Sequence, residues 1–179
     1  MLAGWPLVSG LIRRPPLPPA ILGALPAFEL TDAAGIHLDG HSLAGRVWIL
    51  AFVDTGCVAC AERASSALER VQYRSRNVGT AVGILSVAVD TGAPVIDLPR
   101  EAARHHANPR QWRVAGGADA AKLLAAVSAL APRRAEMLAA GAALALVDAQ
   151  GRVRAVEGIE APASRDRLVS DMTVLLNMR

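Results

Sequence analysis

The chain has 179 residues, which is enough for one domain of ordinary size. Hydrophobic residues make up 53% and charged residues 20%, so the chain can bury a core and is not disordered over most of its length. The net charge is +3, but the basic residues are scattered and aromatic residues make up only 3%. Nucleic-acid binding is therefore not expected, because it needs a clustered basic face or an aromatic stacking platform.

Residues 1–26 differ in composition from the rest of the chain. The apolar opening is interrupted by Pro6, and several prolines follow it closely. A membrane span needs about 20 apolar residues, and an export signal carries its positive charges before the apolar stretch, whereas Arg13 follows it. We therefore predict a flexible, proline-rich amino-terminal segment with no visible anchor, and membrane attachment stays an alternative.

The predicted domain covers residues 27–179 and begins with a β-hairpin. Residues 28–31 alternate between apolar and polar, residues 32–35 have turn composition, and the alternation resumes at residues 36–38. Residues 46–53 then form a nearly continuous apolar run. Such a run is typical of a central strand buried on both faces of a sheet.

The other predicted elements are helices and strands that alternate along the chain. In order they are helix 57–74, strand 81–89, helix 97–106, strand 112–115, helix 119–130, a hairpin of strands 144–147 and 152–156, and helix 164–176. Alternating strands and helices, followed by an antiparallel pair and a closing helix, predict an α/β domain with a central mixed β-sheet flanked by helices.

The two cysteines, Cys57 and Cys60, lie where the predicted central strand turns into a helix. No second ligand pair at suitable spacing accompanies them, which excludes a four-ligand structural zinc site; the two thiols either work with each other or have no chemical role. A Cys-x-x-Cys next to a βαβ pattern is typical of redox proteins with a thioredoxin-like fold. The helix start favours a thiolate at Cys57, which would attack first, and Cys60 would resolve the mixed disulfide.

Neighbouring charged and imidazole side chains bear on this chemistry. Asp54 would oppose thiolate formation and Arg63 would favour it, and the sequence leaves both effects open. The composition around Asp39 and Gly40 indicates a turn, so we place the histidines of the first hairpin in loops or at a strand edge. These are His37 and His41. The second pair, His105 and His106, is placed on a solvated helix, and a histidine borrowed from either pair as a copper ligand stays an alternative.

The chain resembles the SCO (SenC) family over residues 27–177. The resemblance rests on the order and spacing of PAFELTDAAG, LAGRVWILAFVDTGCVAC, SVAVD, HANPRQWRVAGGADAAKLLAAV and ALALVDAQGRVRAV. Proteins of this family have a thioredoxin-like fold and are associated with copper delivery and thiol chemistry during assembly of cytochrome c oxidase. The resemblance therefore implies this fold, a partner such as an oxidase copper-site subunit, and a location in the periplasm or at the extracytoplasmic face of the membrane.

Two departures from the family pattern concern its copper site. The family has three residues between its cysteines and a proline after the second, whereas two residues separate Cys57 from Cys60 and Ala61 follows. The family also carries a ligand histidine just before the penultimate strand, and that position falls on Ala140. The usual two-cysteine, one-histidine copper site is therefore incomplete in this sequence.

Two other classes of thiol protein match less well. Thioredoxins place a cis-proline immediately before the same strand, whereas the nearest proline of this chain, Pro132, lies well upstream. Peroxiredoxins place a threonine three residues before their reactive cysteine, and that position holds Asp54. The SCO-like interpretation is favoured over both.

We therefore expect a thiol-disulfide oxidoreductase that acts through Cys57 and Cys60 on a cysteine pair of another protein, with no required cofactor. One alternative is a metallochaperone that holds Cu(I) between both thiolates without redox turnover. Another is a degenerate relative whose cysteines are only structural. Thiols that titrate at a moderate potential would indicate the oxidoreductase. Metal retained on purification would indicate the metallochaperone, and inert thiols would indicate the degenerate relative.

Overall fold

The computed structural model describes residues 16–89 and 97–178, so residues 1–15 of the predicted amino-terminal segment lie outside the described residues. The strands are β1 (Gly23–Ala24), β2 (Leu30–Asp32), β3 (His37–Leu38), β4 (Val47–Asp54), β5 (Val82–Val89), β6 (Trp112–Gly116), β7 (Ala143–Val147) and β8 (Arg152–Gly158). The helices are α1 (Gly40–Leu43), α2 (Val58–Ser75), α3 (Leu98–Arg104), α4 (Ala120–Leu130), α5 (Ala135–Ala139) and α6 (Pro162–Leu176), with 3₁₀ turns η1 (Arg76–Ala81) and η2 (Pro132–Arg134).

The described strands form one mixed sheet in the order β1-β8-β7-β4-β5-β6-β2-β3. β4, β5 and β6 are parallel, and β7 pairs with β4 in the antiparallel direction. Every residue of β4 before Asp54 is buried, which confirms the prediction of a central strand. Ile49 in its middle lies opposite Ile84 on one side and Leu146 on the other.

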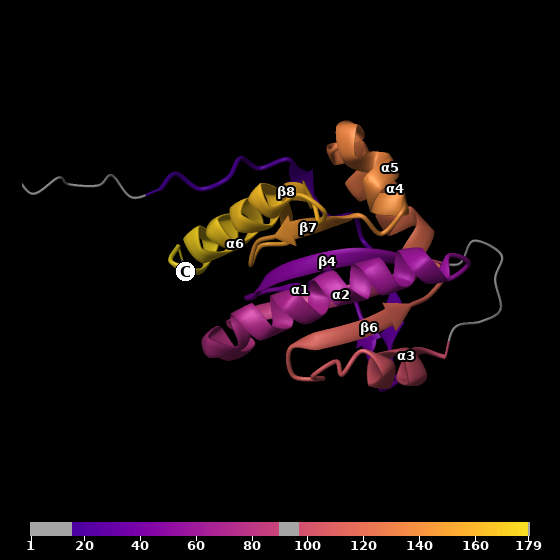
Figure 1. Cartoon of the computed structure of the whole chain (residues 1–179). Helices are drawn as coiled ribbons and strands as arrows, with labels where there is room; N and C mark the ends of the chain where they lie inside the picture. Colours follow the sequence, from indigo (N-terminus) through magenta and orange to yellow (C-terminus); the bar gives the residue numbers. More distant parts are fainter. Residues whose placement is uncertain (1–15, 90–96, 179) are drawn as a thin grey trace, which may run out of the picture.

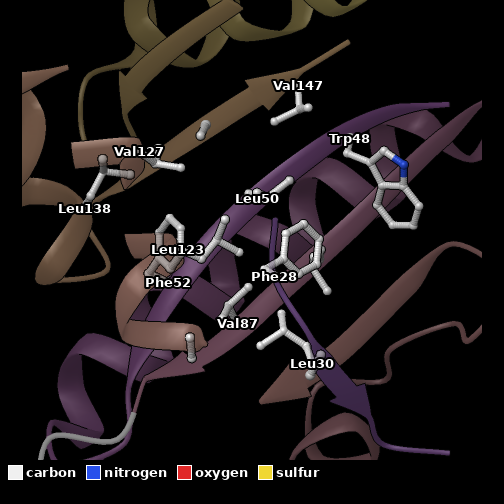
Figure 2. Packing of buried hydrophobic residues seen from close by; sticks show 14 of the residues in the cluster. Phe28, Leu30, Trp48, Leu50, Phe52, Val87, Leu123, Val127, Leu138 and Val147 are labelled. Carbon is white, nitrogen blue, oxygen red and sulfur yellow. The ribbon is translucent and has the colours of Figure 1, made fainter. Parts of the chain in front are cut away.

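Helices cover both faces of the sheet (Figure 1). α2 and α6 pack on one face, where Leu68 and Leu168 join the side chains around Ile49. α4 and α5 pack on the other face, together with α1. Figure 2 shows this second core, in which Phe52 of the central strand lies near Leu123 of α4. The predicted α/β fold, with a mixed sheet between helices and an amino-terminal hairpin, is confirmed.

The segment before the first hairpin adds a short strand to the far edge of the sheet. β1 pairs with β8, with Gly23 opposite Val153. Upstream, the backbone carbonyl of Pro19 accepts hydrogen bonds from Nε (2.9 Å) and Nη2 (2.5 Å) of the buried Arg154. These contacts fall within residues 1–26, where we predicted a flexible segment, so the described part of that segment is partly bound to the sheet.

Two short helices differ from the sequence expectation. Asp39 and Gly40 were expected in a turn, but Asp39 instead caps α1: its Oδ1 accepts from Ser42 N (2.8 Å), and Ser42 Oγ accepts from Asp39 N (3.2 Å). This reciprocal capping satisfies the free N–H groups at a helix start and stabilises a helix too short to show periodicity. α5 was likewise not predicted, since five residues carry too little pattern.

Candidate redox site

The cysteines lie at the end of the central strand, in the turn that leads into α2. Cys57 N donates to the backbone carbonyl of Asp54 (3.2 Å), and Gly56 N donates to the Asp54 carboxylate (2.8 Å). Cys57 is then the N-cap residue of α2. A disulfide joins Cys57 to Cys60, with their Cα atoms 5.2 Å apart. The structure therefore shows the oxidised form of the pair.

The start of α2 is arranged to stabilise negative charge on Cys57. Its Sγ accepts a hydrogen bond from Cys60 N (3.2 Å), and its carbonyl accepts from Ala61 N (2.9 Å). After reduction, the N–H groups and the positive end of this 18-residue helix would favour a thiolate at Cys57. The carboxylate of Asp54, held inside the same turn, acts in the opposite direction because like charges repel.

Access to the disulfide is open on the side of the helix start. Both cysteines are half-buried, while Gly56, Val58 and Ala59 beside them are exposed. Val58 is 66% exposed and leaves an apolar contact surface next to the sulfurs. The turn that carries the disulfide is therefore reached from outside without displacing the core.

The segment before β7 packs directly against the cysteine turn. Gly141 has φ +64°, and a Cβ added there would lie 3.0 Å from the Cys60 carbonyl oxygen and 3.3 Å from Cβ of Ala64. Glycine is favoured for both reasons, since other residues rarely adopt this φ and a Cβ would make tight contacts that require the neighbouring atoms to move. Sequence reasoning missed Gly141, although a glycine immediately before a buried strand is a signal of close backbone approach.

Ala140, at the position of the family's ligand histidine, ends α5 next to Gly141. The contact between Gly141 and Cys60 places this segment beside the cysteine turn, as the resemblance requires. Pro132 lies in η2, and α5 separates it from this segment. The side chains that approach the sulfurs from this direction are therefore small ones.

The histidines lie away from the cysteines. His105 is held between Glu69 (3.5 Å) and Glu101 (3.6 Å) and stacks on Trp112. Glu69 lies about 18 Å along α2 from Cys57, at 1.5 Å per residue. β3, which carries His37, is separated from β4 by β5, β6 and β2. It is therefore about 19 Å from β4 at the usual strand spacing.

A three-ligand copper site is not assembled by the described residues. Within them, no three His, Cys, Asp or Glu side chains come together in a way that could hold a metal ion. The sulfurs of Cys57 and Cys60 can supply two soft ligands, which suit Cu(I), but no imidazole completes them. The donor set thus fits a dithiol centre and does not fit the two-cysteine, one-histidine arrangement.

Trp112 is 2% exposed, and its Nε1 donates to Ser86 Oγ (2.6 Å). Across residues 16–89 and 97–178, no helix has both the length and the apolar character needed to cross a membrane.

A disulfide at the first turn of a helix, directly after the central strand of a mixed sheet, defines a thioredoxin-like domain. Its fold is that of solved SCO/SenC structures. A SCO1/SenC family lipoprotein from Bacillus anthracis matches with TM-score 0.69 and 18% identity, over 86% of this chain and 95% of that chain.

Two further structures of the same kind match along nearly their whole length. BsSco, described as a member of the Sco family of cytochrome c oxidase assembly proteins, matches with TM-score 0.68 and 18% identity, over 90% of this chain and 97% of its own. Yeast Sco1 with copper bound matches with TM-score 0.56 and 16% identity, over 84% and 92%. No family model and no curated protein matches the sequence.

Proposed function

We propose that the protein is a thiol-disulfide oxidoreductase of SCO type that exchanges electrons with a cysteine pair of another protein through Cys57 and Cys60. The observation that carries this proposal is the disulfide at the start of α2, accessible beside the exposed Val58. A purely structural disulfide has no need of an exposed position at a helix start, where a thiolate is stabilised. Reduction and oxidation at this position are therefore chemically supported.

The exchange proceeds through a mixed disulfide. In the reduced protein, the Cys57 thiolate attacks one sulfur of the partner's disulfide, forms the mixed disulfide and releases the partner's other sulfur as a thiolate. The Cys60 thiolate then attacks Cys57 Sγ, closes the Cys57–Cys60 bond and releases the partner's second thiolate. Two electrons pass from this protein to its partner, and the opposite direction follows the same steps in reverse.

We infer the class of partner from the fold and from the descriptions of the solved structures that this chain resembles. BsSco is described as a cytochrome c oxidase assembly protein, and yeast Sco1 was solved with copper bound. A copper-binding cysteine pair must be reduced before it accepts the metal, and a dithiol protein supplies that reduction. We propose such a pair, on an oxidase copper-site subunit, as the substrate.

The compartment we propose is the extracytoplasmic side of the membrane. Disulfides persist in oxidising compartments and are rare in the reducing cytoplasm. The Bacillus anthracis neighbour is described as a lipoprotein, which supports the same side. A reporter fusion that is active only outside the cytoplasm would test this placement.

The test of the oxidoreductase proposal is the reactivity of the two thiols. Alkylation of the reduced protein with mass detection across pH should modify Cys57 before Cys60, and a redox titration should show one reversible two-electron step. A matched Val58→Ala variant should keep the potential and slow exchange with a protein substrate. Equal, slow labelling of both thiols, or no oxidation by a mild oxidant, would contradict the proposal.

Cu(I) carriage without turnover is the second candidate, and the adjacent sulfurs are the observation that favours it. We expect weak or absent Cu(II) binding and, at most, Cu(I) binding that disappears in Cys57→Ser. Ala140→His should increase Cu(II) affinity, and Ala139→His, one residue earlier and exposed, is the matched control. Tight Cu(II) binding by the unmodified protein would favour the carrier and would require one of its four histidines to move.

A further inference from the structure

A cavity of about 130 Å³ lies between α2 and α6, where β8 ends. Both helices lie on the same face of the sheet (Figure 1). The floor of the cavity is apolar and combines residues of both helices with the sheet: Ala67, Val71, Leu144, Ile159, Leu168 and Val169. A closed apolar cavity of about 150 Å³ accommodates a benzene ring. This one is slightly smaller, about 130 Å³, but it is open at the exposed Arg70 and Arg74, so a small ring or a branched aliphatic group can enter it in part.

Three guanidinium groups line the same cavity. Arg165 is half-buried and fixed, because its Nη1 donates to the backbone carbonyls of Ile159 (2.5 Å) and Glu160 (3.0 Å). Arg74 is paired with Asp166 at 3.6 Å, but both side chains are largely exposed and such pairs are weak. Arg70 makes no hydrogen bond or ion pair within the described part of the chain.

The acidic side chain that lines the cavity does not neutralise these arginines. Glu157 is already paired with Arg134 (3.8 Å) and Arg167 (3.4 Å), which lie outside the cavity. The cavity therefore combines an apolar floor with an excess of positive charge at its edge. A ligand that matches both properties carries a negative group on a small apolar body.

We propose that this cavity binds a carboxylate attached to a small apolar group. The apolar group would fill the floor, and the carboxylate would accept hydrogen bonds from Arg70 and Arg165, whose planar guanidinium groups match its two oxygens. Arg70 lies about 20 Å along α2 from Cys57, so the site is separate from the disulfide. This proposal does not rest on the redox function and survives if that function fails.

Three isosteric probes test the proposal in the intact protein: benzoate, the neutral benzamide and the cationic benzamidine. Each is titrated while backbone amide shifts are followed by NMR. Benzoate should cause saturable shifts at Val71, Ile159 and Val169, and the affinity should fall as salt screens the arginines. Equal binding of benzamidine, shifts confined to another surface, or no saturable shift would overturn the proposal.

Two variants locate the site. Arg70→Gln should weaken benzoate binding about twofold to fivefold, because an exposed charge pair contributes about 0.4–1 kcal/mol. Arg76→Gln, at the end of the same helix but outside the cavity, is the matched control and should leave the affinity unchanged. Val169→Trp should occlude the floor and abolish binding. An unchanged affinity in Arg70→Gln would exclude the proposed carboxylate contact, whether or not the tryptophan variant folds.

Discussion

The turn that carries the cysteines and the turn between β7 and β8 are stabilised in different ways. In the β7–β8 turn, the buried Asp148 accepts from the backbone N–H groups of Gln150 and Arg152 (3.0 Å each) and from the guanidinium groups of Arg152 (2.8 Å) and Arg154 (2.9 Å). In the cysteine turn, short backbone contacts surround one covalent bond between sulfurs. The β7–β8 turn is held by ionic contacts, whereas the cysteine turn depends on a bond that exchange chemistry can break.

The ionic network at the β7–β8 turn sets the protonation of Asp148. Burial alone would raise the pKa of Asp148, but the hydrogen bonds from Arg152, Arg154 and Gln150 outweigh it and hold the pKa below its ordinary value of 3.8. A charged network of this kind near the sulfurs would compete with thiolate chemistry. The ionic network of Asp148 lies at the β7–β8 turn instead, away from the cysteines.

The largest effect is expected from Ile49→Asp, since Ile49 lies on the strand that joins the two regions and is fully buried. An unpaired charge in the core should cost about 4 kcal/mol or more of the free energy of unfolding. Ile49→Val is the matched control and should cost about 1 kcal/mol. Chemical denaturation measures both, and a variant that melts like the parent would contradict the central position of β4.

Asp148→Ala tests the ionic turn alone. It leaves the buried Arg154 without its carboxylate, which should cost about 3 kcal/mol, while the reactivity of the two thiols stays unchanged. Asp97→Ala, which removes an exposed cap of α3, is the control and should cost about 1 kcal/mol. A loss no greater than that of the control would show that the network contributes little.

The Asp148 network also predicts a pH dependence. Because the folded pKa of Asp148 lies below the unfolded value, its contribution to stability is present above about pH 4 and is lost as the pH falls through the folded pKa. Asp148→Asn should therefore lose part of the acid sensitivity of the free energy of unfolding. Equal slopes of the free energy of unfolding for parent and variant between about pH 2 and pH 4 would contradict this assignment.

Reduction of the disulfide should have a smaller effect, because the closed loop is short. Loop-closure entropy predicts a loss of about 2 kcal/mol, and the double variant Cys57→Ser/Cys60→Ser should show no response to reductant. Amide hydrogen exchange should rise around Cys57 and stay constant at Arg152. A rise at both turns would show that the two regions are coupled.

The smallest effect is expected at Asp171, which is the opposite case to Asp148. Burial, together with the nearby charge of Glu157, raises the pKa of Asp171, and Arg167 only partly offsets this. The folded state binds the proton more tightly, so stability declines as the pH rises from the ordinary value of 3.8 through the folded pKa. Asp171→Asn should slightly raise Tm at neutral pH, and a lower Tm would contradict the sign.

Local pattern was sufficient for much of the fold and for part of the site. The apolar run before Cys57 and the helical spacing after it were enough to predict the central strand and the helix start, because both depend on neighbours in the sequence. Gly141 could not be placed in this way, since its contact with Cys60 joins residues far apart in the chain. The same holds for β1, because its partner β8 lies far away in the sequence.

The short helices could not be predicted from the sequence for a different reason. α1 depends on the reciprocal hydrogen bonds of Asp39 and Ser42, and the same residue types are equally common in turns. From the sequence, only the resemblance to the SCO family placed Ala140 near the cysteines. The close approach of its neighbour Gly141 to Cys60 now gives a physical reason for that placement. No sequence pattern indicated the cavity between α2 and α6, because its lining comes from four separate elements and the segment after β8.

The packing of Gly141 against the cysteine turn has a consequence for the order in which the protein is made. A ribosome adds about 5–20 residues per second, so Gly141 is synthesised roughly 4–17 s after Cys57. Throughout that interval the nascent chain carries both thiols without the segment that later covers one side of them. The cysteine turn therefore stays open on that side until synthesis has passed Gly141, and the contact with Cys60 is among the later ones that the fold can make.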